Sequence, residues 1–259
     1  MYKIIAMKKL FFSFLAIQFS IGINAQDKTQ YLEVDYQMEV KLDIEEVLNN
    51  VPAEWRAAVQ DQLKTEMGKG IFLDYKLKTN NSESEYKMQE KLSNSQSGGG
   101  MIATQIAAAD KEPLFKDLKE GVYLKPYDFG KAYIIKDSLQ KFDWKITKEK
   151  EQIAGFDTYK ATGLMNDSIN VTAWYTPKLN FKDGPDRLWG LPGLILKAEF
   201  TSNGADLVIT AVNVAVKEDE LKIKKPSKGQ TLTEKEFMEE MKKIQEEYKD
   251  MYGGGVDSE

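Results

Sequence analysis

Three carboxylates occur in the stretch DGPDRLWGLPGLILKAE. Asp183 and Asp186 flank the Gly184-Pro185 dipeptide, and Glu199 ends the stretch. Two carboxyl groups can divide the roles of general acid and general base when their environments separate their pKa values. The chain holds 41 Asp and Glu residues, however, so such near-pairs are expected by chance. Aspartate also favours turns by hydrogen-bonding to the nearby backbone, so a carboxylate-dependent hydrolase is the least favoured of three functional hypotheses.

The sequence contains neither histidine nor cysteine. A Ser-His-Asp triad and a cysteine nucleophile are therefore excluded. Zinc, copper and haem sites are disfavoured because their usual ligands are imidazole and thiolate groups. No Asp-x-Asp-x-Asp-Gly calcium loop occurs, and the Gly98–Gly100 run lacks the strand and the Lys-Ser/Thr of a phosphate-binding loop. We expect a non-enzymatic protein with no catalytic, metal-binding or cofactor-binding residue.

The N-terminal segment MKKLFFSFLAIQFSIGINAQ has the three-part pattern of a secretory signal peptide. Lys8 and Lys9 precede an apolar run from Leu10 to Ile23, and small residues end the segment at Ala25. The apolar run is short for a membrane anchor, which needs about 20 residues. We predict that residues 1–25 are removed, that the mature chain has no membrane span, and that it is exported.

The mature chain is acidic. Residues 1–25 hold three of the 36 basic residues and none of the 41 acidic residues, which leaves a formal net charge of −8. Nucleic acids and anionic membrane surfaces bind proteins that present a basic face. We therefore expect neither as a general partner.

The clearest structural signal is the segment YLEVDYQMEVKLDI, in which seven apolar residues from Leu32 to Ile44 alternate with polar ones. This period of two predicts a long strand with one buried face. Shorter alternating segments follow, and Asn203-Gly204 between the last two is a strong hairpin signal. A helical pattern spans Trp55 to Met67. The Gly-, Ser- and Ala-rich segment 94–112 lacks periodicity and is predicted to be a flexible loop.

The C-terminal segment is predicted to be an amphipathic helix over residues 233–252. Thr233 and Glu236 form a capping-box pattern at its start. A stripe of apolar residues at helical spacing faces a densely charged side, and its members are Phe237, Met241, Ile244, Tyr248 and Met251. We expect this stripe to pack on the rest of the domain, with docking of a partner as the alternative. Residues 253–259 are predicted to form a disordered tail.

These segments together predict an α+β fold, with a β-rich domain over residues 26–232. About ten strands form a large curved, mainly antiparallel β-sheet that resembles a half-barrel. One helix follows the first strand, and the amphipathic helix ends the domain. The repeated alternation indicates that helices cover one face of the sheet while the other face is solvated.

A tight turn is predicted within the stretch WGLPGLI. Pro192 and Gly193 stand at the second and third positions of a type II turn, since proline presets φ and glycine accepts a positive φ. Gly190 before them frees the backbone to bend. Trp189 and Leu191 are apolar enough to be buried, so the turn is expected to lead into a core strand.

The sequence GLPGLI resembles the name-giving motif of the GLPGLI family of bacterial exported proteins. Upstream, TAWYTPKLNFKDGP resembles the family's Trp-Tyr-Thr-Pro strand with its following Gly-Pro, and TYKATG resembles its Lys-Ala-Thr strand. The likeness covers about Phe142 to Ala215. The residues that carry the motif, with a structural role in the turn, are Gly184, Pro185, Gly190, Leu191, Pro192, Gly193, Leu194 and Ile195.

This resemblance implies an exported protein in the periplasm or cell envelope of a Gram-negative bacterium, often encoded beside TonB-dependent outer-membrane receptors. The first hypothesis is a non-enzymatic binding or carrier module for an apolar ligand or a peptide, with Trp174, Tyr175 and Trp189 as contacts. It draws on the likeness of curved antiparallel sheets to periplasmic lipoprotein carriers, a fold-level analogy. The alternative is an accessory protein of a TonB-dependent outer-membrane transport system, with an outer-membrane receptor as its partner.

Overall fold

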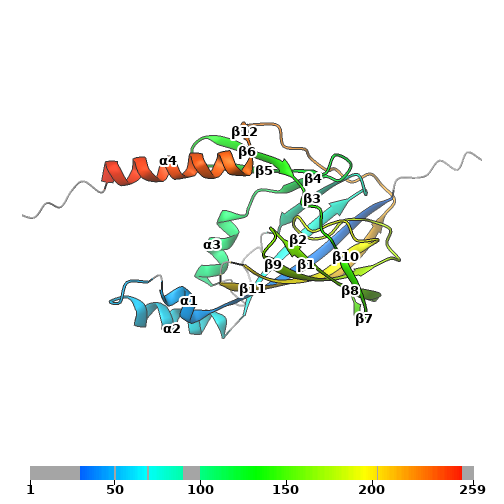
Figure 1. Ribbon diagram of the computed structural model, residues 1–259, viewed down its shortest axis with the longest axis horizontal. Coiled ribbons are helices and arrows are strands. Elements are labelled where there is room, and N and C mark those ends of the chain that lie inside the picture. The colour runs from blue at the N-terminus through cyan, green and yellow to red at the C-terminus, as the bar shows by residue number, and fades with distance from the viewer. Residues whose placement is uncertain (1–29, 50, 69, 90–99, 203, 253–259) are drawn as a thin grey trace, which may run out of the picture.

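A computed structural model describes residues 30–49, 51–68, 70–89, 100–202 and 204–252 (Figure 1). The predicted signal peptide, the predicted C-terminal tail and the first part of the predicted loop lie outside the described residues.

Within this part of the chain, twelve strands form one sheet and four helices lie around it (Figure 1). The strands are β1 (Tyr31–Leu42), β2 (Ile71–Thr79), β3 (Glu83–Met88), β4 (Leu114–Asp117), β5 (Val122–Asp128), β6 (Ala132–Ser138), β7 (Lys145–Ile153), β8 (Phe156–Met165), β9 (Ile169–Thr176), β10 (Leu194–Ser202), β11 (Ala205–Lys217) and β12 (Gln230–Leu232). The helices are α1 (Ile44–Asn49), α2 (Arg56–Met67), α3 (Met101–Ala109) and α4 (Glu234–Tyr252).

The sheet consists of two meanders that are joined by one long-range strand pair. Strands β1 to β6 follow one another in sequence order on one side, and strands β7 to β11 do so on the other. The joining pair, β1 with β11, runs antiparallel from Tyr31 opposite Lys217 to Leu42 opposite Ala205, and we call it the seam. At one edge, the short strand β12 pairs with β6 in parallel. The predicted large, mainly antiparallel sheet with a C-terminal helix is confirmed, and the sheet is open.

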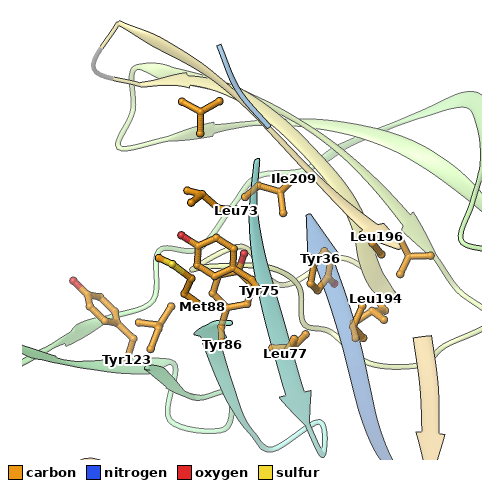
Figure 2. Packing of buried hydrophobic residues seen from close by; sticks show 14 of the residues in the cluster. Tyr36, Leu73, Tyr75, Leu77, Tyr86, Met88, Tyr123, Leu194, Leu196 and Ile209 are labelled. Atoms are coloured by element: carbon orange, nitrogen blue, oxygen red, sulfur yellow. The ribbon is translucent and has the colours of Figure 1, made fainter. Parts of the chain in front are cut away.

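Alternation in β1 separates the two faces of the sheet. Leu32, Val34 and Tyr36 are fully buried, and we call the face that they share the inner face. Side chains of β2, β3, β10 and β11 extend the same apolar cluster, as Figure 2 shows for ten labelled residues. Around β9 and β10 a second cluster, which includes Tyr175 and Ile195, covers the opposite face as well. The expectation of one covered and one solvated face therefore holds only for part of the sheet.

Strand β1 ends two residues before the alternation does. The sequence pattern predicts a strand up to Ile44, but Oδ1 of Asp43 accepts hydrogen bonds from the backbone N–H groups of Glu45 and Glu46. An aspartate in this position caps a helix, and the short helix α1 begins at Ile44. The predicted helix over Trp55–Met67 is present as α2, so two helices rather than one follow the first strand.

Residues 101–109 form helix α3, so the loop predicted over 94–112 is wrong for this part of the segment. The sequence MIATQIAAA is rich in alanine, the strongest helix former. Oε2 of Glu66, on α2, accepts a hydrogen bond from the Ile102 N–H and so satisfies one of the free donors at the start of α3. A helix made mostly of small residues has no clear stripe of large apolar side chains, so the apolar spacing of the sequence does not indicate it.

The start of α4 has the predicted capping box. The Thr233 N–H and hydroxyl both donate to Oε2 of Glu236, and the Glu236 N–H donates to the Thr233 hydroxyl oxygen. Phe237 is buried beside the rings of Tyr127 and Tyr133, with centroids 4.9 and 5.7 Å away. Met241 is half-buried against the same cluster. Beyond these first turns α4 extends past the sheet (Figure 1), and the side chains of Tyr248 and Met251, the last two of the predicted stripe, lie outside the described part of the structure.

Replacing Thr233 with alanine is expected to lower the free energy of unfolding by about 1 kcal/mol, because a backbone donor at the helix start loses its partner. The backbone N–H and hydroxyl of Thr233 lower the pKa of Glu236. The stability that the capping box contributes is therefore fully present at pH values above the ordinary pKa of glutamate. It is lost as the pH falls through the lowered pKa of Glu236. Urea denaturation at pH 7 and at acidic pH measures both effects. An equal difference at both pH values would contradict the role of Glu236.

Candidate ligand-binding cleft

A cleft of about 310 Å³ opens on the inner face of the sheet and is lined by residues of both meanders. It lies between the start of α4, the end of α3 and the connection from β9 to β10. Its volume falls in the range of small-molecule sites, about 300–1,000 Å³. Four tyrosines from strands β2, β3 and β5 line it, namely Tyr75, Tyr86, Tyr123 and Tyr127. Figure 2 shows three of them, Tyr75, Tyr86 and Tyr123, among the core side chains.

Tyr86 places a buried hydroxyl without a partner at this cleft. Its residue is 4% exposed, and its hydroxyl has no hydrogen-bond partner among the described residues. Its ring stacks on that of Tyr75 with centroids 4.8 Å apart. Burial raises the pKa of the Tyr86 hydroxyl well above its usual range, so the hydroxyl stays protonated. A buried hydroxyl without a partner costs about 1–3 kcal/mol, which a bound polar group could recover.

Two cationic side chains of the cleft are held by acidic partners. Lys125 forms an ion pair with Asp110, with Nζ 2.5 Å from Oδ1, and Asp110 also accepts a hydrogen bond from the Tyr75 hydroxyl. Arg187 donates to both carboxylate oxygens of Glu234 at 3.3 Å. These pairs tie the end of α3 to β5, and the β9–β10 connection to the start of α4.

Tyr123 completes the second of these groups. Its hydroxyl donates to Glu234 at 2.9 Å and accepts from Arg187 at 3.3 Å. The guanidinium also lies over the Tyr123 ring, 5.2 Å from the centroid. Three groups therefore hold Arg187 in place: the ring and the hydroxyl of Tyr123 on β5, and the carboxylate of Glu234 on α4.

Asp186 differs from the other acids of the cleft. Its carboxylate makes no hydrogen bond and no short ion pair within the described part of the chain, and its backbone adopts a positive φ of 49°. Aspartate tolerates this left-handed conformation better than most residues. Burial chiefly raises the pKa of Tyr75, Tyr86 and Tyr127, and the nearby negative charges of Asp110 and Asp186 raise it further. Both carboxylates therefore act on the tyrosines of the cleft.

The β9–β10 connection, residues 177–193, is positioned by a fully buried ion pair. Nζ of Lys116 on β4 lies 2.6 Å from Oδ1 of Asp183, and both side chains are 0% exposed. Lys116 also donates to the Gly184 carbonyl at 2.7 Å. From β1, the Tyr36 hydroxyl donates to the Ile195 carbonyl at 2.6 Å. These contacts join the second meander to the first, and they place Asp186 and Arg187 over the cleft.

The turn at Pro192 is tighter than the predicted type II turn. The Gly193 N–H donates to the Leu191 carbonyl, whereas the Leu194 N–H, which would close a type II turn, donates to Leu179. This three-residue pattern is a γ-turn. The expected positive φ at Gly193 is present, at 151°. A Cβ on Gly193 would lie 2.2 Å from the Thr176 carbonyl oxygen, so the backbone of β9 also demands glycine here.

The predicted contact residues lie outside the cleft. Trp174 and Tyr175 are 9% and 5% exposed in the two core clusters, and Lys197 covers the Trp174 ring. The indole N–H of half-buried Trp189 donates to the Gln140 carbonyl. All three side chains are thus packed or hydrogen-bonded within the protein itself. The cleft tyrosines escaped the sequence analysis because their only signal is the alternation common to every strand.

The motif residues and the three carboxylates of the opening stretch have separate environments. Most of the motif is buried, whereas Gly190 and Pro192 are exposed. Asp183 pairs with Lys116 in the core, Glu199 pairs with Lys197, and Asp186 lines the cleft. Among the described residues no group of three or more acids could hold a metal ion. In the same part of the chain, no helix is both long and apolar enough to cross a membrane.

A family model described as "Protein of unknown function (Porph_ging)" matches residues 164–197. This segment runs from the end of β8 through β9 and the following connection into β10, and it contains the GLPGLI sequence. The match is compatible with the predicted resemblance to the GLPGLI family. A search of curated proteins found no match.

The fold of this chain is also similar to those of solved structures. The structure of PNGF-II in space group C2 superposes with a TM-score of 0.52 at 18% identity, covering 83% of this chain and 33% of that chain. This chain therefore spans about a third of the PNGF-II chain. An uncharacterized conserved protein from Thermus thermophilus has a TM-score of 0.34 at 10% identity, covering 77% of this chain and 90% of that one. The likeness to PNGF-II concerns the fold alone.

Proposed function

We propose that the protein is an exported, non-enzymatic binding protein of the bacterial cell envelope, and that the tyrosine cleft is its binding site. The observation that carries the proposal is the buried, unpartnered hydroxyl of Tyr86 within a cleft of about 310 Å³. Tyrosine gives large contact area with few rotatable bonds, so it binds at low entropic cost. The resemblance to an exported family supports the cellular location.

The ligand that fits best is a peptide or another molecule with both polar and apolar parts. Asp186 and Arg187 lie at the cleft, and a purely apolar chain would remove water from their charges without replacing it. An acyl-chain carrier is therefore less well supported than a peptide-binding role. The alternative, an accessory role beside a TonB-dependent receptor, is compatible with a peptide ligand, since a receptor segment is itself a peptide.

Replacing Tyr86 with phenylalanine is the sharpest test of this site. The change removes one unsatisfied oxygen, so the free protein is expected to keep its stability or gain about 1 kcal/mol. Ligand binding is expected to weaken, because the hydroxyl's partner on the ligand is lost. Tyr159→Phe on β8 makes the same chemical change outside the cleft and serves as the control.

The measurement is native mass spectrometry of the tagged full chain, purified gently from the envelope of its own host. The wild type and Tyr159→Phe are expected to carry a bound molecule that Tyr86→Phe retains to a smaller extent. Wild-type protein without any bound molecule, or equal retention by all three proteins, would count against the tyrosine cleft as a binding site.

A further inference from the structure

We propose that the cleft selects a positively charged group, namely the ammonium or guanidinium group of a lysine or arginine side chain in a peptide. The inference rests on the proposed binding function and adds the charge of the ligand to it. Three features carry it: the excess of negative charge at the cleft, the tyrosine rings with the free Tyr86 oxygen, and the fixed position of the Asp186 carboxylate.

The first feature is the charge balance. The charged residues at the cleft are Lys125 and Arg187 against Asp110, Asp186 and Glu234, which leaves one negative charge in excess. Lys125 is paired with Asp110, whereas Arg187 is bonded to Glu234 and is also attracted by the charge of Asp186, so Asp186 and Glu234 share the excess negative charge. An anionic ligand would have to break one of these pairs, whereas a cation can pair with Asp186 directly.

The second feature is the aromatic lining. The faces of tyrosine rings attract ammonium and guanidinium groups within about 6 Å, and the attraction grows when water is excluded. The stacked rings of Tyr75 and Tyr86 are buried, and Arg187 already shows this mode of contact over Tyr123.

The Tyr86 oxygen adds a polar partner to these rings. A phenolic oxygen can accept a hydrogen bond as well as donate one. The free Tyr86 oxygen can therefore accept an N–H from the same cation that pairs with Asp186.

The third feature is the fixed position of Asp186. Its backbone is held in the left-handed region, next to Gly184 and Pro185, which are buried. Gly184 is in turn anchored through its carbonyl by Lys116. A carboxylate that is held in place before binding loses little entropy when the ligand arrives, which favours it as a recognition group.

The test uses four N-acetylated, C-amidated pentapeptides, Gly-Ser-X-Ser-Gly, with X as lysine, arginine, norleucine or glutamate. Each is titrated into the full chain, and amide chemical shifts are followed by NMR. The lysine and arginine peptides are expected to shift signals of residues that line the cleft, and to bind about tenfold more tightly than the other two. A tenfold difference corresponds to about 1.4 kcal/mol.

Asp186→Asn removes the charge and keeps a residue that accepts a positive φ. It is expected to reduce binding of the lysine peptide about tenfold. Asp167→Asn is the matched control, because Asp167 also has a positive φ, at 57°, and lies in the turn between β8 and β9. It is expected to leave the affinity unchanged.

The outcomes separate the two proposals. If the norleucine or glutamate peptide binds in the cleft as tightly as the lysine peptide, the charge preference is wrong while the binding function stands. An Asp186→Asn variant with wild-type affinity would also overturn the charge preference. If none of the peptides shifts cleft signals, this inference fails, and the ligand retention of Tyr86→Phe then decides whether the binding function fails with it.

Discussion

Replacing Asp183 with alanine is expected to lower the free energy of unfolding by about 3–5 kcal/mol. The change leaves the Lys116 ammonium buried without a counter-charge in a place where both side chains are 0% exposed. The Gly184 carbonyl remains as one hydrogen-bond partner, which is too little to replace the solvation that an ammonium loses on burial. Urea denaturation, with the midpoint and slope compared to wild type, measures the loss.

Two further variants separate the charge effect from a loss of packing. The double variant Lys116→Met, Asp183→Leu removes both charges and fills the space, so it is expected to recover most of the lost stability. Asp157→Ala breaks an exposed ion pair with Lys178, whose side chains are 64% and 63% exposed, and should cost less than about 1 kcal/mol. An Asp183→Ala variant that loses no more than Asp157→Ala would show that the buried pair is absent from the folded protein.

Replacing Gly193 with alanine is expected to destabilise the domain by about 1–3 kcal/mol through its backbone conformation, with a φ of 151°. The added Cβ would also lie 2.2 Å from the Thr176 carbonyl oxygen and 2.9 Å from Cα of Pro177. Moving the backbone at Thr176 and Pro177 to make room is expected to cost a further amount of stability of about the same size as the conformational strain. A large drop in melting temperature, measured by circular dichroism, is therefore expected, and Gly193→Val should be worse.

Gly155→Ala is the matched control for this position. Gly155 also has a positive φ, at 81°, but an added Cβ there would meet no atom within 4 Å. It should show the conformational cost alone. If Gly193→Ala melts at the same temperature as Gly155→Ala, the close approach of β9 to the turn contributes nothing. If Gly193→Val melts like wild type but abolishes a cellular function, the structural role of the turn is wrong.

Much of the fold could be predicted because long, alternating segments specify long strands. The six alternating apolar residues of β1 and the paired turn residues between later strands are local signals, and such signals can be recognised in a single sequence. Strands β4 and β12, with four and three residues, are too short to show a period. The parallel pairing of β12 with β6 depends on long-range packing that no short pattern encodes.

The candidate site could not be predicted for a similar reason. Tyr75, Tyr86 and Tyr123 stand far apart in the sequence, and only the register of β2 to β5 brings them to one face. Asp183 and Asp186 both stand out in the sequence, but their positions beside Gly184-Pro185 indicate only two equivalent members of a turn. The partner that distinguishes them is Lys116, in a strand too short to be recognised.

The division of the sheet into two meanders has a consequence for how the chain folds. Each meander joins strands that are neighbours in sequence, whereas the seam joins Tyr31 to Lys217. Closing such a long loop costs more chain entropy than closing any hairpin does, so the seam is expected to form late. The contact of Lys116 with Asp183 crosses between the meanders and belongs to the same late step. A substitution at either residue is therefore expected mainly to speed unfolding and to leave the rate of folding almost unchanged.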